Sequence, residues 1–193
     1  PHIPWAFDSV MLSYWMHNRL WINDPDFLIV RGLETSTEKI TNVTNPEANN
    51  PNPPRWRRGP DFNYEEAKTW ASIVMLTGGS TMMSDRISAL NEAGIGLLRK
   101  SIQPVGVRPE PLDLCDDARP ALWLQRLPKE NRLTVINWRD QPIKRAINLP
   151  DYGVQAPPKL TEYWTGRSWK NEGGTVLLEL PAHGTVVLTW PSP

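Results

Sequence analysis

Apolar and polar positions in the first part of the chain follow strand-like and helix-like patterns. An apolar stretch over residues 19–30 is interrupted once, by Asn23-Asp24-Pro25-Asp26, here called the NDPD tetrad. The unbroken run over residues 27–30 is typical of a strand buried on both faces, as the strands of parallel sheets are. We therefore predict a strand over about residues 19–30 that carries the tetrad at its carboxyl end.

Helical signals stand on both sides of this strand. Residues 1–4 are expected to be extended because prolines are closely spaced there, and a helix is expected to begin at Asp8 or Ser9. A later helix is expected to begin after Asn63, which forms a capping-box pattern with the glutamate three residues on. Its apolar stripe ends at Gly78-Gly79.

The pattern then repeats with a strand and another helix. Residues 80–83 are expected to form a short buried strand, and Ser84-Asp85 is expected to cap a helix from Arg86 to about Lys100. The order strand, loop, helix, strand, helix predicts a parallel α/β arrangement.

Short runs separated by turn signals replace the helical patterns in the second half. Glycine pairs and His183-Gly184 between these runs are typical of hairpin turns. We predict an antiparallel β-sandwich over residues 104–193, after an α/β unit over residues 1–103. The runs expected as strands are 121–126, 132–138, 143–149, 160–164, 175–180 and 185–190.

Composition excludes several classes of function. The 193 residues carry 21 basic and 21 acidic side chains, so nothing points to nucleic acid. No apolar run approaches the roughly 20 residues of a membrane span. Cys115 is the single cysteine, which excludes an internal disulfide and leaves the compartment open. The three histidines share no metal-ligand spacing and no phosphate-loop motif is present, so we expect no metal and no cofactor.

A long segment over residues 33–62 has no regular pattern and is rich in asparagine and proline in its middle. Loops of this length in compact domains are usually lids, binding loops or disordered. The run Arg55-Trp56-Arg57-Arg58 has two interpretations, a clamp for a ligand or a solvated surface loop. We favour the solvated loop.

The NDPD tetrad places two carboxylates beside a predicted buried strand. Pro25 fixes its own φ and restricts Asp24, so the segment is rigid. Two interpretations remain open from these residues alone, a strand-end turn and a ligand site. Retaining glycoside cleavage needs two carboxylates about 5 Å apart on opposite sides of one bond. Asp24 and Asp26 flank a single proline and do not suit that task.

Three segments carry a resemblance to a known family. The tetrad with its lead-in Leu20-Trp21-Ile22 resembles the WLNDPD or WNDPD segment of the retaining α-galactosidase clan, the melibiase-like glycoside hydrolases. Residues 65–85, with Glu65-Glu66-Ala67 and Gly78-Gly79-Ser80, are similar to the family's EEA…SGG…LSD. Residues 135–184 are similar to the all-β domain that closes these enzymes. The resemblance implies the last part of a (β/α)₈ barrel, about the final two βα units, plus the C-terminal sandwich.

The resemblance also implies roles for particular residues. Asp26 is expected to reach the active-site pocket and bind a sugar hydroxyl, with Phe27 lining the pocket beside it. Asp24 is expected at the same substrate-binding site, where it holds the loop together with Asn23. For Asp85 a helix cap and a place in the site are both open, and we favour the cap. The family's nucleophile and acid/base would lie before Pro1, so no catalytic carboxylate is expected in this chain.

Three functional hypotheses follow. The first is part of a retaining α-galactosidase-like hydrolase that cleaves terminal α-linked galactose. The second is a non-catalytic carbohydrate-binding sandwich that uses two exposed tryptophans, Trp164 and Trp169, on either side of a turn at residues 166–168. The third is a related α-glycosidase or galactosyl transferase. The first hypothesis implies a carbohydrate substrate. It also implies that the strand edges near residues 22 and 82 are covered by the remaining barrel segment, which belongs to the same protein or to a separate chain.

Overall fold

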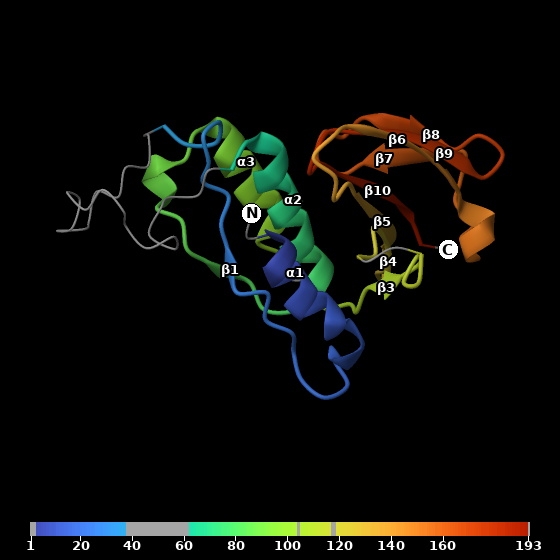
Figure 1. Ribbon diagram of the computed structural model, residues 1–193, viewed down its shortest axis with the longest axis horizontal. Helices are drawn as coiled ribbons and strands as arrows, with labels where there is room; N and C mark the ends of the chain where they lie inside the picture. Colours follow the sequence, from blue (N-terminus) through green and yellow to red (C-terminus); the bar gives the residue numbers. More distant parts are fainter. Residues whose placement is uncertain (1–2, 38–61, 104, 117–118, 193) are drawn as a thin grey trace.

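The computed structural model describes residues 3–37, 62–103, 105–116 and 119–192. The expected ligand clamp at residues 55–58 lies outside these ranges. Figure 1 shows three helices between a short strand segment, β1, and a large set of antiparallel strands. One hydrophobic core runs through these layers, because Leu28, helix residues such as Ile73, and Trp123 and Trp164 belong to the same buried cluster.

The described part of the first half contains three α-helices and two very short strands. A 3₁₀ turn lies between α1 and β1 (Tyr14–Met16) and another between β2 and α3 (Ile87–Ala89). The helices and strands are α1 (Ile3–Leu12), β1 (Phe27–Leu28), α2 (Tyr64–Thr77), β2 (Met82–Met83) and α3 (Glu92–Ser101). β1 and β2 pair in parallel, with Phe27 opposite Met82, which confirms the predicted parallel arrangement at this point.

The central helix, α2, forms where the sequence predicts it. The Asn63 side chain accepts the N–H of Glu66, and the Glu66 carboxylate accepts the N–H of Asn63, so the capping box is complete. Gly78 ends the helix in the left-handed conformation, with φ 68°. Nearly every residue from Ala67 onward is buried. Such burial on all sides follows from the position of α2 between two layers.

Two predicted helix starts are wrong. α1 begins at Ile3 and not at Asp8 or Ser9, so residues 3 and 4 are helical where extended chain was expected. A proline in the first helical turn loses no hydrogen bond and has a suitable φ. α3 begins at Glu92, capped by Asn91, whose side chain accepts the N–H of Gly94. Ser84-Asp85 therefore does not cap this helix.

The second half consists of two antiparallel sheets that share a core. The larger sheet has the strand order β3-β4-β5-β10-β7-β8, and the smaller one pairs β6 with β9. Leucines and valines from both sheets form one buried cluster, which is the sandwich packing expected from the sequence. The strands are β3 (Glu110–Pro111), β4 (Leu122–Arg126), β5 (Glu130–Ile136), β6 (Ile143–Asn148), β7 (Lys159–Glu162), β8 (Ser168–Lys170), β9 (Thr175–Leu180) and β10 (Thr185–Pro191).

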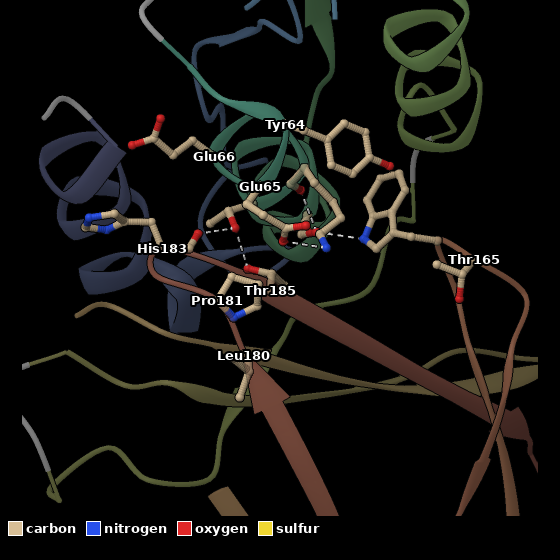
Figure 2. Close-up of polar contacts among 12 residues, drawn as sticks. Tyr64, Glu65, Glu66, Thr165, Leu180, Pro181, His183 and Thr185 are labelled. Carbon is tan, nitrogen blue, oxygen red and sulfur yellow. Dashed lines mark hydrogen bonds and ion pairs between the residues drawn. The ribbon is translucent and has the colours of Figure 1, made fainter. Parts of the chain in front are cut away.

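The two halves are joined by a polar seam as well as by the shared core. Figure 2 shows the loop with Pro181 and His183, and Thr185 at the start of β10, against α2. The Thr69 hydroxyl donates to the His183 carbonyl at 2.6 Å and lies 2.8 Å from the Thr185 hydroxyl. The division into residues 1–103 and 104–193 stays a prediction.

Candidate functional site

The NDPD tetrad interrupts the parallel pairing of β1 and β2. At the first residue of the tetrad Ser80 donates its N–H to the Asn23 carbonyl at 3.0 Å, and after the tetrad Ser84 donates to the Leu28 carbonyl at 3.2 Å. Between these two bonds the tetrad strand has one residue more than the facing segment. The extra residue makes a β-bulge, and Asp26 adopts a left-handed φ of 69° within it.

This geometry corrects the predicted strand over residues 19–30. Regular pairing is limited to Phe27–Leu28, so the tetrad precedes β1 and does not follow it. The Asp24 carboxylate accepts the N–H of Asp26 at 2.9 Å, which closes a tight turn. That turn takes the backbone of the tetrad out of the ladder. Bulges are common beside active sites because they re-aim side chains.

Asn23 anchors the tetrad to the interior. It is buried, its side chain accepts the indole N–H of Trp21 at 2.9 Å, and it donates to the Ser13 carbonyl at 3.2 Å. Its own N–H donates to Nδ1 of His17 at 3.0 Å. Every polar group of Asn23 is therefore engaged within the protein, and its role is to hold the loop, as expected.

His17 was not predicted to matter, because no sequence motif links it to Asn23, six residues later. The ring is buried, and burial lowers the pKa of His17 below its usual 6.5, while the Gly78 carbonyl acts in the opposite direction. A protonated ring has no free lone pair on Nδ1 and loses the bond from Asn23.

Acidification is therefore expected to weaken the anchor of the tetrad. The folded-state pKa of His17 lies below the unfolded-state value, so its contribution is present above about pH 6.5 and is lost as the pH falls below that value. The free energy of unfolding of the unaltered chain and of His17→Gln should converge between about pH 7.5 and about pH 5. Urea titration at each pH measures this, and a pH-independent difference between the two proteins would contradict it.

The side chains expected to meet a sugar are exposed. Asp24, Asp26 and Phe27 are all accessible, with Phe27 46% exposed, whereas Leu28 is fully buried. Leu28 thus points into the core that it shares with α2, and Phe27, the neighbouring side chain of β1, points to the opposite face. Within the described ranges the Asp26 carboxylate accepts no hydrogen bond. A free carboxylate can bind a sugar hydroxyl, and an exposed aromatic ring can cover the C–H side of a sugar.

Asp85 has a structural task. Its side chain is buried and accepts the N–H of Val30 at 2.7 Å and Nη1 of Arg31 at 2.7 Å. It ties the segment after β2 to the segment after β1, and both carboxylate oxygens are used. The favoured prediction of a helix cap is wrong, because the partners of Asp85 stand more than fifty residues earlier in the chain.

The two tryptophans proposed for a sugar-binding sandwich are used inside the fold. Trp164 is buried and its indole N–H donates to the Ser72 hydroxyl of α2 at 3.0 Å. Trp169 is half-buried and donates to the Leu177 carbonyl at 3.1 Å. The prediction that both are exposed is wrong, and this pair offers no surface platform for a ring.

The seam between α2 and the sandwich also collects charged side chains (Figure 2). Lys68 pairs with Glu65 at 2.6 Å, and its ammonium lies 5.8 Å from the ring centre of Tyr64. Burial raises the pKa of Tyr64, and the charges of Glu65 and Glu162 add to that. Glu162 accepts three hydrogen bonds from Trp164 and Thr165. Lys68 is paired with Glu65, and the Glu162 carboxylate is engaged by Trp164 and Thr165, so these charges serve the packing of the seam.

The described ranges contain neither a metal-binding cluster nor a membrane-spanning helix. No group of histidine, cysteine, aspartate and glutamate side chains there could hold a metal ion. None of the helices in those ranges is long and apolar enough to cross a membrane.

The fold is similar to parts of several glycoside hydrolase structures, while no family model matches the sequence. A GH27 β-L-arabinopyranosidase from Geobacillus stearothermophilus, in complex with arabinose, aligns with a TM-score of 0.67, 15% identity, 97% of this chain and 41% of its own. A candidate α-galactosidase/melibiase from Bacteroides fragilis aligns with a TM-score of 0.64 and 13% identity, over 88% of this chain and 34% of its own. α-Galactosidase I from Mortierella vinacea aligns with a TM-score of 0.53 and 14% identity, over 68% of this chain and 36% of its own. The chain thus has the fold of a part of these enzymes and spans about two-fifths of their length or less.

Proposed function

We propose that this chain supplies the closing part of a (β/α)₈ barrel and the accessory sandwich of a retaining α-galactosidase-like glycoside hydrolase. The substrate of that enzyme would be a terminal α-linked galactose. The parallel β1–β2 pair with helices on one side supports the barrel part. The similarity to the α-galactosidase and arabinopyranosidase structures supports the enzyme class.

The observation that carries this proposal is the bulge at Asp26. It leaves the Asp26 carboxylate exposed and without a partner among the described residues, and Phe27, which follows it in the chain, is exposed as well. In the proposed enzyme Asp26 binds a sugar hydroxyl, Phe27 covers the C–H side of the ring, and Asp24 fixes the turn through the N–H of Asp26. The barrel part would be residues 1–103 and the sandwich residues 104–193.

The nucleophile and the acid/base would come from outside these 193 residues. Asp24 and Asp26 belong to one turn, in which the Asp24 carboxylate binds the backbone of Asp26. Two carboxylates held in this way do not bracket a glycosidic bond from opposite sides. Asp85 is buried and engaged twice, so it does not provide the second group.

Exposed apolar side chains around the tetrad and β2 support the proposal that further barrel strands pack against this region. They line the tetrad strand and β2, where a complete barrel would place further strands. In the proposal they contact the remaining barrel segment, in the same protein or as a separate chain. They are Leu20, Trp21, Ile22, Phe27, Met82 and Met83, each at least 40% exposed.

The purified 193-residue chain is expected to show no hydrolysis of a nitrophenyl α-galactoside, because neither catalytic carboxylate is in it. The protein that contains the complete barrel is expected to hydrolyse the same compound. Release of nitrophenol measures both. Turnover by the isolated chain would contradict the proposed division of the active site, and an inactive complete protein would contradict the proposed enzyme class.

A second candidate is a related glycosidase with a different sugar preference. The structure with the TM-score of 0.67 is that of a β-L-arabinopyranosidase. β-L-Arabinopyranose has the ring stereochemistry of α-D-galactose without the exocyclic CH₂OH group. The ratio of kcat/KM for the two nitrophenyl glycosides separates these candidates, since even a single methylene group changes discrimination by about 10–200-fold.

A further inference from the structure

The sandwich half contains a cavity of its own, separate from the tetrad. It has a volume of about 320 Å³ and lies between the segment before β4, the end of β5 and the start of β6. Its walls include Trp138, Ile136 and Ile143 on the apolar side. A cavity of this size is at the lower end of the range for small-molecule sites.

The base of the cavity is rigid. The Asp113 carboxylate is buried and accepts the N–H groups of Ala121 and Leu122 at 3.1 and 2.9 Å, and Nη2 of Arg145 at 3.1 Å. The Asn137 side chain donates to the Pro181 carbonyl at 2.7 Å. These groups are therefore occupied, and they fix the backbone around the cavity without offering hydrogen bonds to a ligand.

The indole of Trp138 is fixed in the same way. Its N–H donates to the Pro120 carbonyl at 3.1 Å, and its ring packs against Phe7 with ring centres 4.3 Å apart. One part of the ring is thus held by the core while another part lines the cavity. A fixed aromatic surface at a cavity wall loses little conformational entropy on binding.

Two charged side chains at the cavity remain available. Arg139 and Asp116 both line it, and neither side chain has a hydrogen bond or ion pair in the described part of the chain. A guanidinium and a carboxylate supply several donors and acceptors for vicinal hydroxyls, and an indole covers the C–H side of a sugar ring. This combination of groups is the chemistry that recognises a pyranose.

We propose that this cavity binds one pyranose unit of a saccharide, at a distance from the Asp26 site. Asp116 accepts from hydroxyls, Arg139 donates to ring or hydroxyl oxygens, and the sugar packs on the part of Trp138 that lines the cavity. The choice of a saccharide over other polar ligands rests on the proposed function. The cavity, its rigid base and its two available charged groups are observed independently of the proposed function.

Calorimetric titration of the 193-residue chain with galactose, L-arabinose and melibiose tests this. We expect saturable binding of at least one of them, weakened at least about tenfold in Arg139→Ala and in Asp116→Asn. Arg167→Ala, which changes an exposed arginine elsewhere on the sandwich, should bind as the unaltered chain does. Thermal unfolding of each variant verifies that it is folded.

The outcomes separate this proposal from the proposed function. Absence of binding to all three sugars overturns the accessory site. Binding that is lost in Asp26→Asn and kept in Arg139→Ala places the sugar at the tetrad, which overturns the accessory site and supports the glycosidase pocket. Equal weakening by both variants also overturns it, because the effect is then not local to the cavity. Hydrolysis by the complete protein is an independent readout of the proposed function.

Discussion

Gly79→Ala is expected to destabilise the chain by about 3 kcal/mol or more. A Cβ atom at this position would lie 1.7 Å from the carbonyl oxygen of Asn23, which is backbone and accepts the N–H of Ser80. Neither atom can move away without breaking the hydrogen bonds that position the tetrad. The conflict is steric, because Gly79 is not among the residues with positive φ.

Gly96 provides the matched control. It is exposed within α3, and a Cβ atom there would meet nothing within 4 Å. Gly96→Ala should raise the free energy of unfolding by about 0.5–1 kcal/mol, because alanine is the better helix former. Urea unfolding of the two variants and the unaltered chain gives both values. A Gly79→Ala variant as stable as the unaltered chain would show that the Asn23 carbonyl does not lie this close to Gly79.

The helix α2 and the sandwich strands could be predicted because their signals are local. Asn63 and Glu66 are three residues apart and form both bonds of the capping box. The strands β4, β6, β9 and β10 begin or end within a residue or two of the predicted runs. Alternating burial along β9 shows why a period of two residues identifies such strands.

The positions that were mispredicted depend on distant partners. Asp85 has the sequence context of a helix cap, yet its partners are Val30 and Arg31, 55 and 54 residues away. Trp164 is buried by a contact to Ser72, 92 residues away. The bulge at Asp26 likewise exists only because Ser80 and Ser84 pair on either side of it. Local patterns contain no information about such pairings, and the resemblance to a family pointed to the tetrad but not to the bulge within it.

Asp26→Asn in the protein with the complete barrel is expected to lower kcat/KM for a nitrophenyl α-galactoside about tenfold to a hundredfold. The amide has the shape of the carboxylate but no charge, and a hydrogen bond to a charged group contributes about 1.5–3 kcal/mol. The left-handed φ of 69° is compatible with asparagine as well as aspartate, so the bulge should persist. The loss would then report on sugar binding and not on folding.

Glu92→Gln is the control for the loss of one negative charge, because Glu92 is exposed in the first turn of α3. The decisive measurement is kcat/KM for the three proteins, with thermal unfolding alongside. The account predicts a loss of about tenfold or more in Asp26→Asn alone, with its melting temperature unchanged. Equal kcat/KM values for Asp26→Asn and the unaltered protein would contradict a saccharide pocket built around the tetrad.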